Sequence, residues 1–340
     1  MNKKIISSLE FGRVLAIFAV LALHAGLFNS YPLYNDEPWV GNIFNQLTRF
    51  GVPLFFLLAG YFVKPKLASH PLSGLTSYAK PLLRVWVVWS IICLILPFRG
   101  DVLLEHGYLA ERQGFFNYLS QSLANTLVQG GLDYLWFLPA LVMAVAIIAL
   151  LDHFKQARLL LPVAIALYLY GVLAGSYVVL TDLPSPFFTR NGPFFSTLLV
   201  SLGYLIRQNS FMVKPSTAFI MMVIGLLAHM SEAYFLFTHG AAFNVNDYLF
   251  GTALWATGLF LLLLNYPDFG NNRVIHYLGR RVLAIYVVHM IFLIYMMNIE
   301  VLIGAKYAMR DLLQFGGTTL TTLLFIALIE RTPLKKWLFR

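Results

Sequence analysis

Apolar residues recur in long runs along this chain, and polar residues gather between the runs. A helix that crosses the hydrocarbon core of a bilayer needs about 20 consecutive, mainly apolar residues. Ten runs approach that length, at residues 9–28, 44–63, 82–98, 134–151, 159–180, 193–207, 215–236, 247–266, 282–300 and 312–330. The pattern predicts an all-α, polytopic transmembrane helical bundle of about ten spans.

The composition supports the same class of protein. Of the 340 residues, 59% are hydrophobic and 11% are charged, with a mean hydropathy of +0.73, whereas about 25% of residues are charged in a soluble domain. We find no cleavable signal peptide, repeat or attached soluble domain, so residues 1–340 are expected to form a single integral-membrane domain. The only cysteine, Cys93, excludes an intrachain disulfide and a cysteine-based metal site.

The basic residues predict the orientation of the spans. A net charge of +9 would suggest a nucleic-acid partner for a soluble protein, but here the positive-inside rule explains it. With the N-terminus inside, 17 of the 24 basic residues fall in cytoplasmic segments: Lys3, Lys4, Lys64, Lys66, Lys80, Arg84, Lys155, Arg158, Arg207, Lys214, Arg273, Arg280, Arg281, Arg331, Lys335, Lys336 and Arg340. Five fall outside: Arg99, Arg112, Arg190, Lys306 and Arg310. Both termini are therefore expected in the cytoplasm.

The first span carries ionisable residues on a single face. Arg13 and His24 are 11 residues apart, which is about three turns plus 20° on a helix and a rise of about 16 Å. Glu10 joins this face at i,i+3 spacing and can pair with Arg13. Ionisable residues in the hydrocarbon are costly unless they face a protein interior or a wet cavity. The simpler alternatives are an Arg13 that snorkels to the interface and a His24 that only bonds a neighbouring helix.

Four segments in series resemble motifs of the membrane-bound acyltransferase-3 family. The first is Glu10-Phe11-Gly12-Arg13 followed by His24, and the second runs from Phe50-Gly51-Val52-Pro53 to Ala59-Gly60-Tyr61. The third is Leu135-Trp136-Phe137-Leu138-Pro139, and the fourth joins Leu278-Gly279-Arg280-Arg281 to Tyr286-Val287-Val288-His289. The resemblance covers the chain from residue 10 to residue 289.

The resemblance implies transfer of an acyl group, usually acetyl, from coenzyme A in the cytoplasm to a hydroxyl. The acceptor in such enzymes is usually a carbohydrate of the cell surface or an exported polysaccharide. It also implies a multi-pass protein of the bacterial inner membrane, in contact with lipid and possible polysaccharide synthesis or export machinery, with no nucleic-acid partner. Acetyl-CoA would be the donor co-substrate, and no metal is expected.

The chemistry of such a transfer suggests roles for particular residues. A base must take the acceptor's proton, and His24 suits this because histidine titrates near neutral pH. Arg13, oriented by Glu10, would hold the donor or complete a polar channel. Many family members carry an Arg-x-x-Arg pair in the third span, where this chain has Lys80 and Arg84, so these two would bind the coenzyme A phosphates. The positive-inside rule alone also explains them.

Three further residues are candidates for contact with the acceptor. Trp136 can stack on a sugar ring or belong to an interfacial aromatic belt. Tyr286 and His289 share a helix face, and His289 can orient His24, bind the acceptor or simply pack.

A different class of function also fits the pattern. Intramembrane polar residues and a second span interrupted at Pro53 suit a transporter or flippase of a glycan or acyl intermediate. The sequence leaves open the glycan, its hydroxyl, the acyl group, the oligomeric state, and the choice between direct attack and an acyl-histidine intermediate.

Overall fold

The computed structural model describes residues 6–31 and 33–339, so the basic residues Lys3, Lys4 and Arg340 lie outside the described part of the chain. Over the described residues the chain is helical and has no β-strand, apart from an isolated bridge between Tyr34 and Glu37. The predicted all-α class is confirmed.

Each of the ten predicted runs contains a helix. In chain order these are α1 (Ser7–His24), α3 (Gly51–Leu67), α4 (Pro71–Ile95), α7 (Phe137–His153), α8 (Leu160–Leu173), α10 (Pro193–Gln208), α11 (Pro215–Thr238), α12 (Phe250–Asn265), α14 (Val282–Ile303) and α16 (Thr318–Ile329). The connections hold α2 (Trp39–Leu47), α5 (Gly100–Ser120), α6 (Leu123–Gln129), α9 (Val178–Thr181), α13 (Arg273–Gly279), α15 (Tyr307–Asp311) and α17 (Lys335–Leu338). Three 3₁₀ segments, η1 (Asp133–Trp136), η2 (Ala157–Leu159) and η3 (Phe243–Val245), and a π-helical turn, η4 (Leu312–Gly317), complete the chain.

Seven stretches of the described chain are long and apolar enough to cross a membrane, and the segment Ala157–Leu173 and helix α12 are shorter apolar helices. The protein is therefore a multi-pass membrane protein by length and composition, while the count of ten spans and the side of each terminus stay predictions.

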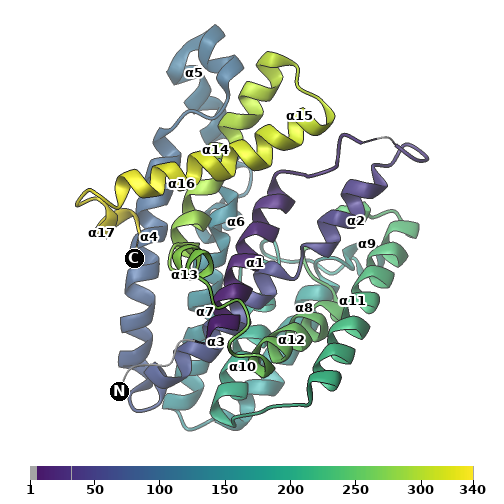
Figure 1. Ribbon diagram of the computed structural model, residues 1–340, viewed down its shortest axis with the longest axis vertical. Helices are drawn as coiled ribbons and strands as arrows, with labels where there is room; N and C mark the ends of the chain where they lie inside the picture. Colours follow the sequence, from purple (N-terminus) through teal and green to yellow (C-terminus); the bar gives the residue numbers. More distant parts are fainter. Residues whose placement is uncertain (1–5, 32, 340) are drawn as a thin grey trace. The chain divides into compact units, whose positions relative to one another are not determined.

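The chain divides into two compact units. The first comprises the described residues of Met1–Val20, Gln46–Lys80 and Ala140–Val282. Inside it, α11 lies along α12 and α3 lies along α10 (Figure 1). Both pairs pack through glycines. A Cβ added to Gly60 of α3 would meet the Val200 carbonyl, and one on Gly225 of α11 would meet the Trp255 backbone. Small residues of this kind let helix backbones approach closely where no hydrophobic effect drives helix association.

The second unit comprises Leu21–Asn45, Pro81–Pro139 and the described residues of Leu283–Arg340. In it, the Asn298 side chain of α14 donates to the Phe98 carbonyl at 2.8 Å and accepts from the Gly100 amide at 3.2 Å. The Trp89 indole donates to the Leu338 carbonyl at 2.7 Å. These bonds hold the corner between α4 and α5 and connect α17 to α4 within this unit.

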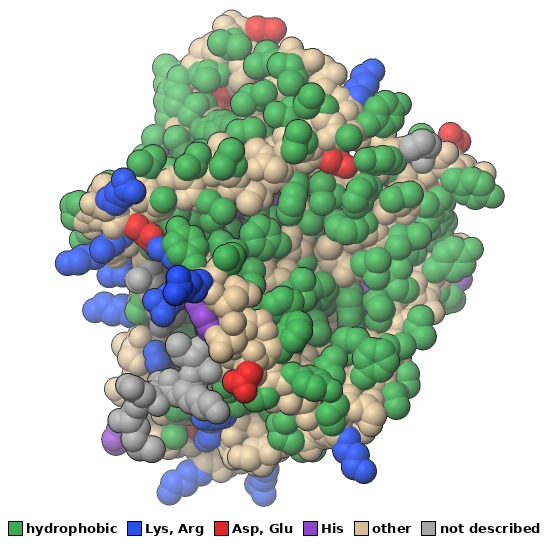
Figure 2. Space-filling model, viewed as in Figure 1, with side chains coloured by type: hydrophobic (Ala, Val, Ile, Leu, Met, Phe, Trp, Pro, Cys, Tyr) green, Lys and Arg blue, Asp and Glu red, His purple; other side chains and the backbone are tan. Residues whose placement is uncertain are grey.

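Apolar side chains dominate the visible surface (Figure 2). They form stripes at the i,i+4 spacing of one helix face, in contrast to the polar surface of a soluble helix. The exposed stripes are Leu83, Val87, Ile91 and Ile95 on α4 and Leu320, Leu324 and Leu328 on α16. Such faces suit contact with lipid.

Several predicted boundaries were wrong. The first run was expected to continue as a helix to Phe28, but α1 ends at His24, and Gly26 and Phe28 have φ of 55° and 67°. The predicted span 247–266 begins only at Phe250, which leaves Asp247 in a loop. The connection between the runs 82–98 and 134–151 contains two helices, α5 and α6.

The second run also differs from its prediction. The interruption lies at residues 48–50, between α2 and α3, and Pro53 occupies the first turn of α3. The first four backbone amides of a helix have no partner within it, so proline costs little there. Pro53 therefore does not cause the interruption, although the candidate span Trp39–Leu67 is interrupted at residues 48–50.

Candidate active site

Two histidines that are 265 residues apart meet in the second unit. His24, at the last position of α1, places its Nδ1 3.0 Å from Nε2 of His289 on α14. The ring centroids are 5.2 Å apart and the planes differ by 8°. That separation matches the hydrogen bond plus two ring radii, so the rings lie edge to edge in nearly one plane, the favourable geometry for an imidazole–imidazole hydrogen bond. His289 is fully buried, and His24 is half-buried.

The partners of His289 assign the tautomers of both rings. Its Nδ1 lies 2.7 Å from the Tyr286 carbonyl and 3.2 Å from the Ile285 carbonyl. Carbonyl oxygens only accept, so Nδ1 carries the hydrogen and Nε2 of neutral His289 is the acceptor. His24 then donates from Nδ1, which places its own lone pair on Nε2. The arrangement gives His24 the tautomer that a general base requires.

Tyr134, which directly precedes the third motif, and residues of the fourth motif hold His289 in place. Tyr134 of η1 donates from its hydroxyl to the Val287 carbonyl at 2.6 Å, and Tyr286 donates to the Tyr134 carbonyl at 2.6 Å. The Tyr134 ring also meets the His289 ring edge to face, with centroids 5.6 Å apart. Sequence reasoning missed Tyr134, because it precedes the Trp-Phe-Leu motif and nothing in its local pattern separates it from other interfacial tyrosines.

A second missed feature fixes the chain just after His24. Arg310 of α15 donates to the Gly26 carbonyl at 2.9 Å, and the Phe28 amide donates to the Asp311 carboxylate at 3.1 Å. These bonds hold the turn that follows α1, in which the Gly26 carbonyl also accepts from the Asn29 amide at 3.1 Å. The turn at Gly26 therefore sets where α1 ends and places His24 at its last position.

Glu10 and Arg13 pair in the first unit, as their spacing predicted. Arg13 Nη1 lies 3.0 Å from Glu10 Oε1, and the Arg13 guanidinium lies over the Phe62 ring at 4.7 Å. Gly279 of the fourth motif lies directly against Glu10, because a Cβ there would overlap the Glu10 carboxylate. The first and fourth motifs thus meet at this ion pair, and a side chain at position 279 would displace the Glu10 carboxylate.

The remaining predicted residues occupy separate positions. Lys80 and Arg84 are exposed on α4, and the Arg84 guanidinium lies 5.9 Å from the Trp337 ring. Trp136 is half-buried at the end of η1, with its ring against Phe137. Among the described residues, no group of three or more His, Cys, Asp or Glu side chains is placed to hold a metal ion.

Comparison with known families agrees with this geometry. Residues 6–331 match a family described as an acyltransferase domain, which covers nearly the whole chain and all four motifs. The chain belongs to membrane acyltransferase family 3. The predicted resemblance is confirmed, and the family supports membrane acyl transfer in general.

The curated relatives of this chain carry other names. The chain is 30% identical over 260 residues to a serine/alanine racemase of Enterococcus gallinarum, an alignment that covers 70% of the chain and 34% of the relative. It is 25% identical over 219 residues to an amino-acid racemase of Enterococcus faecalis, covering 60% of the chain and 28% of that relative. The chain spans about a third of the length of these relatives. No solved structure matches it.

Proposed function

We propose that this protein is an O-acyltransferase that moves an acyl group, most simply acetyl, from cytoplasmic coenzyme A thioester to a hydroxyl of a cell-surface or exported polysaccharide. The hydrogen bond between His24 and His289 carries the proposal, because it fixes the tautomer in which His24 Nε2 can take a proton. We further propose the bacterial inner membrane as its location and polysaccharide synthesis or export machinery as its partner.

The reaction follows general acid–base logic. His24 Nε2 takes the proton of the acceptor hydroxyl as the oxygen attacks the thioester carbonyl carbon. The tetrahedral intermediate then collapses, the carbon–sulfur bond breaks, and the imidazolium returns its proton to the departing sulfur. His289 is a positioning residue in this scheme: it keeps the hydrogen on His24 Nδ1 throughout. The half-buried setting limits the water that would otherwise hydrolyse the thioester.

Roles for the other predicted residues follow from the same proposal. Arg13, held by Glu10, would line the inner end of the donor's path, and Lys80 and Arg84 would bind the coenzyme A phosphates. Trp136 would stack on the acceptor sugar. The Tyr286 hydroxyl already donates to the Tyr134 carbonyl, so it would meet the acceptor as a hydrogen-bond acceptor or through its ring.

The Arg84→Ala variant is expected to weaken donor use more than acceptor use. Arg84 is exposed at the predicted cytoplasmic side and carries a planar fork of donors suited to phosphate. Titration of acetyl-CoA at fixed acceptor should show a raised apparent KM for the donor, with the KM for the acceptor unchanged. Arg331→Ala, which also removes one predicted cytoplasmic charge, is the matched control. An unchanged donor KM would mean that Arg84 serves only to orient the protein in the membrane, as the positive-inside rule describes.

Donor and acceptor are expected to reach the protein from opposite faces of the membrane. The basic segments predicted inside suit an anionic nucleotide, and His24 at the far end of α1 lies beyond the bilayer midplane on this topology. In sealed proteoliposomes of known orientation, acceptor supplied outside should be acylated when acetyl-CoA is supplied only inside. Transfer that requires both substrates on the cytoplasmic side would instead mean that precursors are modified before export.

The same assay separates the alternatives. Release of free coenzyme A from acetyl-CoA identifies an acyltransferase, since a transporter or flippase leaves the thioester intact. Because one relative is named a serine/alanine racemase, the acceptor panel includes serine, whose hydroxyl is also an acylation target, with alanine as its hydroxyl-free control.

A further inference from the structure

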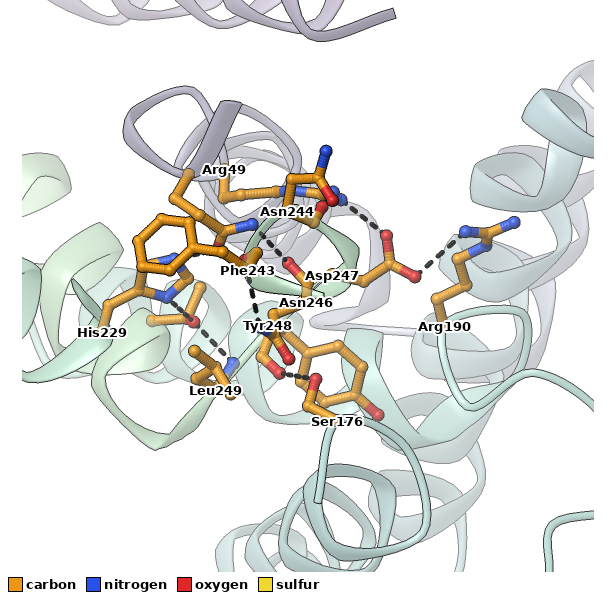
Figure 3. Close-up of polar contacts among 12 residues, drawn as sticks. Arg49, Ser176, Arg190, His229, Phe243, Asn244, Asn246, Asp247, Tyr248 and Leu249 are labelled. Carbon is orange, nitrogen blue, oxygen red and sulfur yellow. Dashed lines mark hydrogen bonds and ion pairs between the residues drawn. The ribbon is translucent and has the colours of Figure 1, made fainter. Parts of the chain in front are cut away.

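A second polar cluster lies in the first unit, and none of its residues has a role in the proposed reaction (Figure 3). The Asp247 carboxylate bridges two arginines: Oδ1 accepts from Arg49 Nη1 at 2.6 Å, and Oδ2 accepts from Arg190 Nη1 at 3.0 Å. The three residues come from three connections of the chain, between α2 and α3, between η3 and α12, and between α9 and α10. On the predicted topology all three connections lie at the outer ends of their spans.

Further hydrogen bonds hold the backbone around the cluster. Arg49 Nη2 also donates to the Asn244 carbonyl at 2.7 Å, and Ser176 donates to the Tyr248 carbonyl at 2.9 Å. The residues on either side of Asp247, Asn246 and Tyr248, are buried. Below the cluster, the buried His229 joins Thr252 at 2.8 Å and Gln46 at 2.9 Å. These hydrogen bonds and buried neighbours hold the backbone around Asp247, and its carboxylate lies between the two guanidiniums.

The cluster carries one excess positive charge. Burial opposes ionisation of Asp247, but the nearby Arg190 and Arg49 outweigh it and hold the pKa of the carboxyl below its ordinary value. Both guanidiniums stay charged at any physiological pH. The side chains are 13%, 25% and 29% exposed for Arg49, Arg190 and Asp247, so the charge lies in a half-buried setting that remains open to solvent. Such a site favours an additional anion.

The two arginines differ in their surroundings. Arg49 is held on both nitrogens by Asp247 and Asn244. The Arg190 guanidinium lies over the ring of Phe188 at 5.3 Å, and Phe188 is 57% exposed. An exposed aromatic face beside a guanidinium is a surface on which a sugar ring can stack while its acidic group meets the arginine.

We propose that Arg49 and Arg190 bind an anionic group of the acceptor, a carboxylate or a phosphate on the glycan, with Asp247 as the internal counter-ion that the ligand partly displaces from Arg190. The inference rests on the proposed function for the identity of the acceptor and names its class: an acidic polysaccharide. In this proposal Arg49 keeps its bonds to Asp247 and the Asn244 carbonyl, and the Arg190 side chain reorients toward the ligand.

Binding of simple probes tests the site without any acyl donor. The purified protein in nanodiscs is titrated with sodium D-glucuronate and with inorganic phosphate at constant ionic strength, with D-glucose as the neutral control, and the dissociation constant is measured by calorimetry. Glucuronate or phosphate should bind and glucose should not. Arg190→Ala should weaken anion binding by about tenfold or more, the usual loss of a charge-assisted pair. The probe that binds more tightly identifies the acidic group.

Asp247→Asn should change anion binding in the opposite direction to Arg190→Ala. This variant distinguishes a ligand site from a cluster that only stabilises the fold, here called a clasp. Asparagine keeps the shape and one acceptor oxygen but removes the competing charge, so anion binding should tighten and the anion should raise the unfolding temperature more than in the wild type. Arg99→Ala, which breaks the exposed Arg99–Asp101 pair, is the matched control and should change nothing. If Arg190→Ala and Asp247→Asn both lower the unfolding temperature and neither alters anion binding, the cluster is a clasp and the proposal is wrong.

Failure of this inference is distinguishable from failure of the proposed function. Anion binding that responds to Arg190 and Asp247 in a protein that releases no coenzyme A would contradict acyl transfer and leave the site standing. Coenzyme A release with no anion binding would do the reverse.

Discussion

Replacing His24 with alanine is expected to lower acyl transfer by about 10²–10⁴-fold, the usual effect of losing a general base. The physical reason is the tautomer: the His289 pair puts the lone pair of His24 on Nε2, and alanine removes the atom that takes the acceptor's proton. The measurement is the rate of coenzyme A release and of polysaccharide acylation in proteoliposomes, together with the unfolding temperature of the variant.

The control for this experiment is His239→Ala. His239 is an exposed histidine just after α11, and it belongs to the other unit and to no predicted catalytic motif. Its replacement should change neither the rate nor the unfolding temperature appreciably. Normal glycan acylation by well-folded His24→Ala protein would remove His24 from the mechanism.

His289 provides the finer test, because a positioning residue changes the pH profile as well as the rate. His289→Gln keeps a side-chain acceptor for His24 Nδ1–H. It loses the ring Nδ1–H that His289 donates to the Tyr286 and Ile285 carbonyls, which fixes the tautomer of His289. We expect part of the activity to remain, with a displaced pKa for the acidic limb of the pH–rate profile, where protonation removes the base. If the variant were as inactive as His24→Ala with an unchanged profile, His289 would contact substrate directly.

Local pattern was sufficient for much of the fold. Runs of apolar residues located a helix in every predicted segment, and the i,i+3 spacing of Glu10 and Arg13 predicted their ion pair. Helix periodicity is a local property, so it can be read from neighbouring residues. The end of α1 was missed because it depends on Arg310 and Asp311, which no sequence neighbour of His24 reveals.

The candidate site was only half predictable for the same reason. The polar face of the first span singled out His24, and the Tyr-x-x-His spacing singled out His289, but their contact joins residues 265 apart. Tyr134, which packs on His289, and Asp247, which joins two arginines, gain their meaning only from tertiary contacts. Pro53 was misread because a proline in the first turn and one inside a span look alike until the helix start is known.

Replacing Glu111 is expected to destabilise the second unit by about 3–5 kcal/mol, the usual cost of breaking a buried ion pair by removing one partner. Glu111 and Arg112 are 2% and 4% exposed. Glu111 accepts from the Phe98 and Arg99 amides at 2.9 and 3.0 Å, and Arg112 donates to the Cys93 and Leu94 carbonyls at 3.2 and 3.3 Å. The pair therefore provides partners for backbone carbonyls at the end of α4 and for backbone amides just before α5.

The measurement is the unfolding temperature in nanodiscs of Glu111→Gln, Arg112→Met and the double variant. Each single change leaves a buried polar partner unmatched, so each should lower the unfolding temperature sharply. The double variant removes both charges and should recover a substantial part of the loss. Asp101→Asn at the exposed Arg99–Asp101 pair is the control and should have a much smaller effect. Single and double variants that are additive would show that the two side chains do not act as a pair.

The same pair predicts a pH dependence with a definite sign. Burial opposes ionisation of Glu111, but hydrogen bonds from Arg112 and from the Phe98 and Arg99 amides outweigh it and hold its pKa below the ordinary value of 4.5. A carboxyl whose pKa is lower in the folded state stabilises the fold above its unfolded pKa, and this stability is lost as the pH falls through the folded pKa. The wild-type unfolding temperature should therefore drop once the pH falls below about 4.5, whereas Glu111→Gln, which has no proton to gain there, should lose this part of the decline. A parallel decline in both proteins would place the acid-sensitive group elsewhere in the chain.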